Sequence, residues 1–244
     1  MYRDGARKSL WQQEVKKFDL PGLADSYDVA IVGGGITGYS CAIQLQEAGK
    51  RCIVIEASNT GFGTTGGTTA HINTFFDASY DQVINDFGEE NAKKLAQAGK
   101  DALEIIKSNI DKYQIQCEFD ERVGYLFSLN EEQEKTLEKI WIASNEVGVA
   151  MEYTPDCPFP IPHTRAVSIP GQGQFHPLKY IDGLASAFNS KGGHIADDCR
   201  VTDVDPSDTH LIINTTSGLI IAQHVIYATH TPPGVNILHF RNAP

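Results

Sequence analysis

Short apolar runs and a helix-like spacing alternate near the start of the chain. An apolar run after Asp28 leads into the glycine-rich turn Gly33–Gly38, and a helical pattern then continues to a second apolar run, Cys52–Ile55. A short apolar run bounded by turn residues is typical of a strand that is buried on both faces, as strands of parallel sheets are. The pattern therefore predicts a strand–helix–strand unit that ends at Glu56.

Helical and strand-like patterns continue along the rest of the chain. Tyr80 to about Tyr113 has apolar positions at helical spacing, with Gly88 and Gly99 as expected breaks. A charged helix is expected from Asn130, which with Gln133 forms a capping-box arrangement. The remaining predicted elements are strands at Gly124–Ser128 and Ala166–Ile169, a helix at Leu178–Ser190, and a closing meander at His194–Asp197, Arg200–Val204, His210–Asn214, Leu219–Ala222 and His224–Ala228.

The glycines of the first turn indicate a dinucleotide site. In the pattern GxGxxG, Gly33 permits a tight turn, Gly35 lets a pyrophosphate approach the backbone, and Gly38 lets the helix lie close to the strand. The N-terminus of that helix offers free N–H groups and a positive dipole end to phosphates. Glu56 follows Gly38 by 18 residues, the spacing expected for an acid that binds ribose hydroxyls. The alternative is a glycine-rich turn without a ligand.

The segment Ser58–Thr74 (the Gly/Thr segment) has an unusual composition. It holds four glycines and six threonines among its 17 residues. Such a composition also occurs in linkers. We favour a loop that passes close to a flat ligand, because small residues and hydroxyl donors suit that role and the segment follows Glu56 directly.

Charge and cysteine content narrow the class of protein. The 244 residues carry a formal net charge of −11 and no basic stripe, which argues against a nucleic-acid partner. The five widely spaced cysteines form no metal-binding pattern and are expected to be free thiols in a reducing compartment. The N-terminus lacks an apolar signal core, and the apolar runs are of strand length. We therefore expect a soluble, cytoplasmic protein with no metal and no membrane contact.

Three blocks of sequence resemble the D-amino-acid-oxidase-like (DAO) family of flavoproteins, which includes glycine and sarcosine oxidases. The first is VAIVGGGITG…VIE with its continuation GTTGGTTAH. The second is Gln174–Ala185 with the Arg200-Val201 pair that follows, and the third is Val225–His230. His230 stands where most members have glycine; this departure and the opening around Ser9-Leu-Trp11 resemble a subgroup whose longer members carry a Rieske iron–sulfur domain.

The resemblance implies a fold and a domain division. The expected class is α/β, with a Rossmann-like FAD-binding domain that contains a β-meander and an inserted, incomplete α+β substrate domain. An N-terminal arm would span 1–25, the FAD-binding domain 26–80 and 168–230, and the substrate domain 81–167 and 231–244. Family members run well past this length, so the comparison predicts a truncated member.

The resemblance also implies FAD as the cofactor, and it implies which residues contact it. Small residues and hydroxyls of the three blocks would surround the dinucleotide, and His71 would lie nearest the isoalloxazine. The expected FAD-binding residues are Gly33, Gly35, Ile36, Thr37, Gly38, Glu56, Ala57, Thr64, Thr65, Thr68, Thr69, Ala70, His71, Val201, Ala228 and Thr229.

The resemblance further implies an activity, namely oxidation of a C–N bond in a small amine or amino acid, with hydride transfer to flavin N5. Such sites often need no side-chain base, so no catalytic residue is assigned. Arg122 could pair with a substrate carboxylate or be a solvated charge, and His176 could contact a ligand or cap a helix. Two alternatives stay open, namely a NAD(P)-dependent reductase and a non-catalytic cofactor-binding fragment. The sequence leaves the oligomeric state open.

Overall fold

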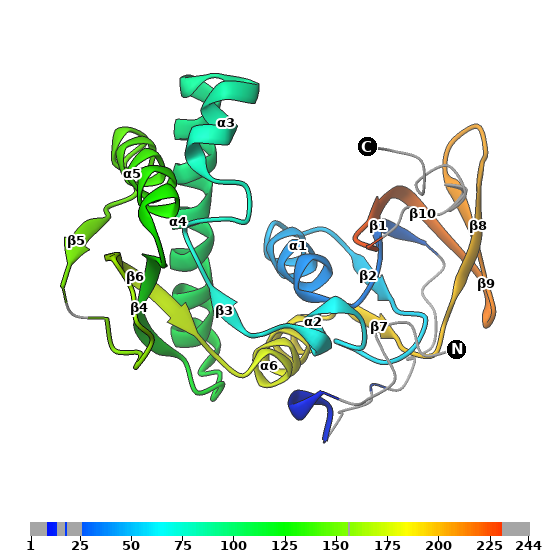
Figure 1. The fold of residues 1–244 in the computed structure, drawn as a ribbon. Coiled ribbons are helices and arrows are strands. Elements are labelled where there is room, and N and C mark those ends of the chain that lie inside the picture. Colours follow the sequence, from blue (N-terminus) through cyan, green and yellow to red (C-terminus); the bar gives the residue numbers. More distant parts are fainter. Residues whose placement is uncertain (1–8, 14–17, 19–25, 156, 231–244) are drawn as a thin grey trace. The chain divides into compact units, whose positions relative to one another are not determined.

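The computed structural model describes residues 9–13, 18, 26–155 and 157–230, and Figure 1 shows its elements. They fall into two compact units. The first is built from the described parts of Met1–Thr69, Tyr113–Cys117 and His176–Pro244, and the second from Ala70–Lys112 and Glu118–Phe175. The second unit is thus largely inserted in the sequence of the first, and the predicted mixed α/β class is confirmed.

The first unit contains a six-stranded sheet with the order β7-β2-β1-β10-β9-β8. The strands β7, β2, β1 and the second half of β10 run parallel, whereas β8, β9 and the first half of β10 form an antiparallel meander. The elements of this unit are η1 (Leu10–Gln13), β1 (Tyr27–Val32), α1 (Ile36–Glu47), β2 (Cys52–Ile55), α2 (Thr64–Gly67), α6 (Pro177–Ser190), β7 (His194–Ala196), β8 (Val201–Pro206), β9 (Leu211–Thr215) and β10 (Gly218–Tyr227).

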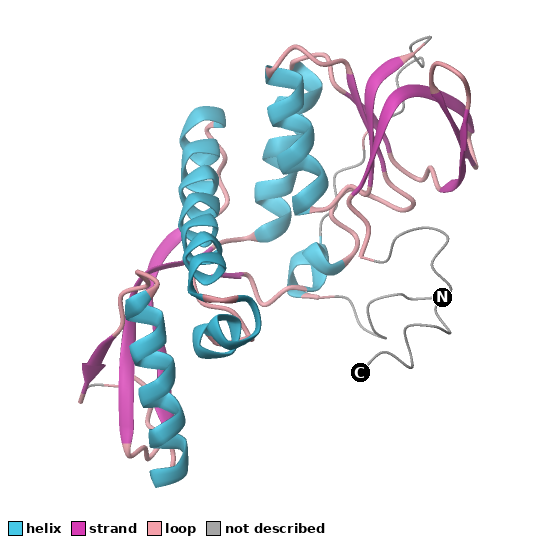
Figure 2. Ribbon diagram, turned by 90° about the horizontal axis from the view of Figure 1, so that it is seen from above, coloured by secondary structure: helices cyan, strands magenta, loops and turns pink. Residues whose placement is uncertain are grey.

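The buried strands explain the parallel part of this sheet. All four residues of β2 are buried, as are five of the six residues of β1. Strands buried on both faces need cover on each side, which the crossover helices of parallel sheets provide. Helices α1 and α6 lie side by side (Figure 2) and contact β1, β2 and β7.

The second unit is an antiparallel sheet with helices. Strand β6 is its centre and pairs with β3, β4 and β5. Its elements are β3 (His71–Ile72), α3 (Tyr80–Phe87), α4 (Glu89–Tyr113), β4 (Asp120–Ser128), α5 (Glu131–Glu146), β5 (Glu152–Thr154) and β6 (Arg165–Gln174). The predicted capping of α5 is confirmed, because the side chain of Asn130 accepts a hydrogen bond from the N–H of Gln133.

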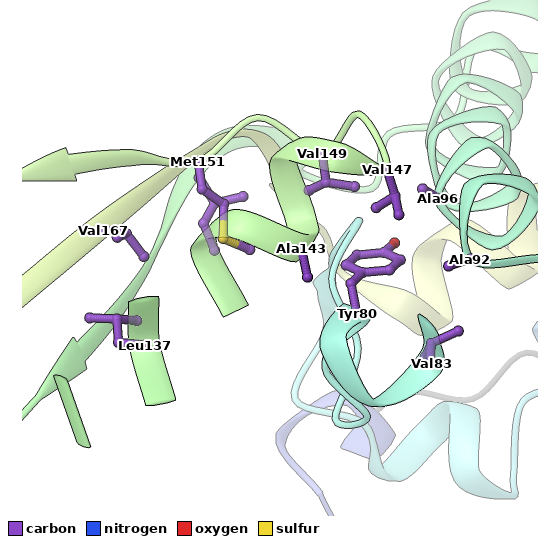
Figure 3. Packing of buried hydrophobic residues seen from close by; sticks show 11 residues of the cluster. Tyr80, Val83, Ala92, Ala96, Leu137, Ala143, Val147, Val149, Met151 and Val167 are labelled. Atoms are coloured by element: carbon purple, nitrogen blue, oxygen red, sulfur yellow. The ribbon is translucent and has the colours of Figure 1, made fainter. Parts of the chain in front are cut away.

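The core of the second unit surrounds Tyr80 (Figure 3). Its ring lies among Val83 of α3, Ala92 of α4 and Val147, which directly follows α5. The Tyr80 hydroxyl donates to the carbonyl oxygen of Thr74 at 2.8 Å, so the polar end of this buried side chain has a partner. Burial raises the pKa of Tyr80 to about 12.

Three sequence predictions about elements are wrong in detail. Gly99 does not end a helix, because α4 continues through it; a Cβ atom there would lie 3.3 Å from the ring of Phe76, so the glycine makes room for packing. The strands expected at Leu219–Ala222 and His224–Ala228 are one strand, β10, since no turn residue separates them. The strand at His194 is not part of the meander but pairs in parallel with β2.

The boundaries of the two compact units differ from the expected domain boundaries. The divisions fall at Thr69/Ala70 and Phe175/His176, whereas the sequence placed them at 80 and 168. The reason is the pairing of β3 with the end of β6, which puts His71 opposite Gln174 in the second sheet. The segment Tyr113–Cys117 also belongs with the first unit.

Candidate functional site

The turn after β1 joins the ends of three parallel strands. Gly33 has a φ of +116°, a conformation that favours glycine. Its N–H donates to the carbonyl oxygen of Ile55 at 2.8 Å, and a Cβ atom on it would lie 2.7 Å from the carbonyl oxygen of Ala228. The ends of β1, β2 and β10 therefore meet at this glycine, with too little space for a side chain.

Helix α1 starts directly above this turn. A Cβ atom at Gly38 would overlap the carbonyl oxygen of Gly33, so the helix can lie this close to the strand only without a side chain there. The N-cap residue Gly35 has no side chain to cap the helix, and the first turn holds no acid. The positive end of the α1 dipole therefore remains available to an anion.

The hydroxyl of Thr65 in α2 lies at the N-terminus of α1. It accepts a hydrogen bond from the N–H of Ile36 at 3.0 Å, and a Cβ atom on Gly35 would lie 3.0 Å from the same oxygen. A threonine hydroxyl that accepts one bond can still donate its own proton. The N–H of Ile36 donates to Thr65, and the O–H of Thr65 can in turn donate to a phosphate oxygen.

Glu56 is held at the end of β2 by backbone groups. Its two carboxylate oxygens accept from the N–H groups of Gly34 at 2.8 Å and Ser58 at 2.9 Å. Its own N–H and carbonyl oxygen bond to Ala196 and Cys199, both at 2.9 Å. A carboxylate has about four acceptor positions, so the half-buried Glu56 keeps acceptor capacity for ribose hydroxyls while its orientation is fixed.

Of the other predicted site residues in the first unit, Ala228 bonds to the end of β1, whereas Val201 lies in the meander. Ala228 donates its N–H to Val32 at 2.8 Å, and Thr229 follows it. Val201 begins β8 and packs against the buried core of the sheet. The rest lie beside residues already placed: Thr37 in the first turn of α1, Ala57 after Glu56, Thr64 in α2, and Thr68 and Thr69 after α2.

Ala70 and His71 belong to the second unit. Ala70 is buried and has a φ of +65°, which is uncommon for a residue with a side chain. The side chain of His71 is exposed in β3. Arg122, also in this unit, forms an ion pair with Asp120. The role of His176 as a helix cap is confirmed in the first unit, because its Nδ1 accepts from the N–H of Lys179 at 3.2 Å.

Sequence reasoning missed a polar network next to Glu56. The Tyr39 hydroxyl bonds to the Thr60 hydroxyl at 2.7 Å, and the latter bonds to Asp197 at 3.1 Å. Burial raises the pKa of Asp197, although hydrogen bonds from Phe18 and Thr60 oppose this shift. Burial likewise raises the pKa of Tyr39. Asp197 directly follows β7, as Glu56 directly follows β2. An acid at the end of a predicted strand could therefore have indicated this network from the sequence.

The described residues show neither a metal cluster nor a membrane-spanning helix. In residues 9–13, 18, 26–155 and 157–230, no three His, Cys, Asp or Glu side chains are grouped as metal ligands would be. Within the same ranges, no helix has the length and apolar character needed to cross a bilayer. The five cysteines, all of which lie in these ranges, form no disulfide with one another. The turn after β1 therefore remains the candidate site that the described residues support.

The described residues fit the dinucleotide that the sequence predicts. Gly35 adds no side chain at the N-terminus of α1, and the hydroxyl of Thr65 lies there beside the helix N–H groups. The bonded carboxylate of Glu56 lies on the neighbouring strand end. The N–H groups at the start of α1 and the hydroxyl of Thr65 suit a pyrophosphate, and the carboxylate of Glu56 suits ribose hydroxyls.

Comparisons with known proteins agree with this fit. The family described as DAO, FAD dependent oxidoreductase, matches residues 28–235. The chain is 31% identical over 229 residues to YhfW of Bacillus subtilis (strain 168), a protein named as a candidate Rieske 2Fe-2S iron–sulfur protein, covering 93% of this chain and 45% of that one. It is 30% identical over 223 residues to the gamma-glutamylputrescine oxidoreductase of Escherichia coli (strain K12), covering 86% of this chain and 50% of that one.

Solved structures show the same fold. Glycine oxidase from Geobacillus kaustophilus superposes with a TM-score of 0.68 at 21% identity, covering 84% of this chain and 56% of that one. L-Proline dehydrogenase from P. horikoshii superposes with a TM-score of 0.67 at 20% identity, covering 85% and 54%. The chain thus spans about half the length of the proteins it matches.

Proposed function

Because the chain belongs to the DAO family of FAD-dependent oxidoreductases, we propose that it oxidises a C–N bond of an amine or amino acid with FAD bound at the turn after β1. One observation carries this proposal: the glycine turn, the N-terminus of α1 and the carboxylate of Glu56 lie together at one end of the parallel strands. The substrate class is supported by the names of the relatives, which include gamma-glutamylputrescine oxidoreductase and glycine oxidase.

The pyrophosphate of FAD would bind at the start of α1. The N–H groups of the first helical turn, including that of Thr37, would face the phosphate oxygens, and Gly35 has no side chain to stand between them. The hydroxyl of Thr65 would donate a further hydrogen bond, because its acceptor side is engaged by Ile36. These neutral donors would stabilise the two phosphate charges in a chain whose net charge is −11.

The adenosine part would bind on the side of Glu56. Its carboxylate would accept from the ribose hydroxyls, while the bonds from Gly34 and Ser58 hold its orientation. Val201, two residues after the Cys199 that bonds to Glu56, would contact the adenine through its backbone. Ala228 and Thr229 would flank the pyrophosphate from β10.

The bound flavin would supply the redox step by accepting hydride from the substrate carbon next to nitrogen. The protein would bind, orient and shield the reacting groups, which requires no side-chain base. Thr64, Thr68 and Thr69 of the Gly/Thr segment, together with Ala70 and His71, would line the flavin. No residue of the chain is assigned a catalytic role.

A visible absorption spectrum of the purified chain tests the cofactor assignment. We expect flavin bands, and we expect FAD as the mass of the nucleotide released on denaturation. Binding of NADH or NADPH without any flavin would contradict the proposal and support a nicotinamide-dependent reductase.

Anaerobic reduction tests the substrate class. Small amines and amino acids should bleach the flavin bands, whereas 2-hydroxy acids of the same size should not. C–N oxidation by this chain would be refuted if photoreduction bleaches the flavin but no compound of a broad panel of amines and amino acids does. That outcome would support a cofactor-binding fragment without turnover.

A further inference from the structure

Three side chains near the N-terminus bind the backbone around α2. Ser9 Oγ donates to the carbonyl oxygen of Gly66, Trp11 Nε1 donates to that of Thr68 at 2.8 Å, and Gln12 Nε2 donates to that of Phe62 at 3.2 Å. These acceptors span residues 62–68 (the α2 segment). Residues about 50 positions earlier in the chain therefore hold both ends of this short segment.

The α2 segment depends on such external contacts. Helix α2 has only four residues, of which Gly66 and Gly67 are two. A helix this short is not stable by itself, and glycine makes its ordering more costly. The packing against Gln12 is close: a Cβ atom at Gly66 would lie 2.8 Å from Gln12 Nε2 and 2.6 Å from the carbonyl oxygen of Gly61.

Trp11 also connects the α2 segment to a rigid helix. Its ring meets the ring of His176 edge to face, with centroids 5.0 Å apart and an interplanar angle of 69°. His176 caps α6, whose inner face, including Tyr180 and Leu184, is fully buried. The indole thus fills the corner between α6 and the α2 segment, and its single N–H reaches Thr68.

Thr65 of α2 lies at the predicted dinucleotide site, where its hydroxyl accepts from the N–H of Ile36. We propose that Ser9, Trp11 and Gln12 are positioning residues that fix the α2 segment, and with it the Thr65 hydroxyl, for FAD binding. This inference rests on the proposed function in one respect, namely that FAD binds at the turn after β1. The hold of these side chains on the α2 segment is a property of the protein alone.

The variant Trp11→Phe tests the inference with little change in shape. Phenylalanine keeps an aromatic ring against His176 but lacks the N–H that binds Thr68. Amide hydrogen exchange at residues 62–68, measured by mass spectrometry without cofactor, should become faster. The Kd for FAD, measured by fluorescence titration, should rise about threefold to tenfold, as expected for one hydrogen bond. Visible circular dichroism of the bound flavin should also change.

Leu10→Ala is the matched control, because Leu10 lies in the same segment with 69% of its surface exposed. It should leave both the exchange of residues 62–68 and the Kd unchanged. The double variant Ser9→Ala/Gln12→Ala should weaken FAD binding further than Trp11→Phe, because it removes two of the three bonds.

The outcomes separate this inference from the proposed function. If the unchanged chain binds no FAD, the proposed function fails, and amide exchange alone decides whether the three side chains hold the α2 segment. If the chain binds FAD, an unchanged Kd and unchanged exchange in Trp11→Phe would overturn the inference. A lower melting temperature with an unchanged Kd would overturn it as well, because it would reduce Trp11 to a packing residue.

Discussion

Replacing Glu56 separates the structural role of its side chain from the ribose contact that we propose for it. Its carboxylate accepts hydrogen bonds from the N–H groups of Gly34 and Ser58, at 2.8 and 2.9 Å. Glu56→Ala removes both bonds, and the N–H of the buried Gly34 loses its acceptor. A hydrogen bond to a charged group contributes about 1.5–3 kcal/mol, and an unpaired buried donor costs about 1–3 kcal/mol. Water can reach the half-buried carboxylate, so we expect a total loss of roughly 2–3 kcal/mol.

This loss should be visible in the protein without cofactor. For a domain of this size, about 1 kcal/mol shifts the melting temperature by roughly 2–4 °C. Glu56→Ala should therefore melt roughly 4–12 °C lower, yet remain folded, because total stabilities are about 5–15 kcal/mol. Glu56→Gln keeps the shape but has one acceptor oxygen, so its melting temperature should lie between those of Glu56→Ala and the unchanged chain.

The assay is differential scanning calorimetry of flavin-free protein, followed by FAD titration of each variant. Flavin must be removed first, because a ligand that binds only the folded state raises the melting temperature. Asp208→Asn, which removes an exposed charge in a turn, controls for net charge and should change neither quantity. Equal melting temperatures for the unchanged chain, Glu56→Ala and Glu56→Gln would refute the structural role of the Glu56 carboxylate. An unchanged FAD affinity in Glu56→Ala would refute the ribose contact.

Three further predictions concern the turn, the helix contact and the buried acid. Gly35→Val should abolish FAD binding in a folded protein, because the new side chain would crowd the Thr65 hydroxyl, which lies 3.0 Å from the position of its Cβ, and would fill the pyrophosphate space. Gly67→Ala, with no atom within 4 Å of the new Cβ, should leave FAD binding intact; flavin retained by folded Gly35→Val would rule out the assignment. Gly38→Ala should lower the free energy of unfolding in urea by about 2–3 kcal/mol, because its Cβ overlaps backbone; an unchanged midpoint would contradict this packing. Because burial raises the pKa of Asp197, the folded state holds that proton to higher pH than the unfolded state. The stability of the unchanged chain relative to Asp197→Asn should therefore fall as pH rises from about 3.9 through the raised value; a difference that is flat with pH would refute this.

The glycine turn could be predicted because its constraints are local. The conformation of Gly33 and the close approach at Gly38 follow from a strand, a tight turn and a helix that are consecutive in sequence. The cap at Asn130 is local in the same sense. In each case the residues that must fit together lie within a few positions, so residue type and spacing carry the information.

The errors came from contacts between distant segments. Gly99 has a poor helix propensity, but the packing of Phe76 and the length of α4 outweigh that cost of about 1 kcal/mol. The sequence predicted the strand at His194 to be the first strand of the meander. In the structure this strand pairs in parallel with β2 instead. Strand β10 is continuous because it borders β9 along its first half and β1 along its second.

By itself, the sequence determined the strand–turn–helix unit, the spacing from Gly38 to Glu56 and the unusual composition of the Gly/Thr segment. Only the tertiary structure decided which of these parts meet. It placed the Thr65 hydroxyl at the first N–H of α1, gave Glu56 two backbone donors, and brought Trp11 to the backbone of Thr68. The physical reason is that a hydrogen bond depends on the final positions of two groups, and chain folding sets those positions for partners that lie far apart in sequence.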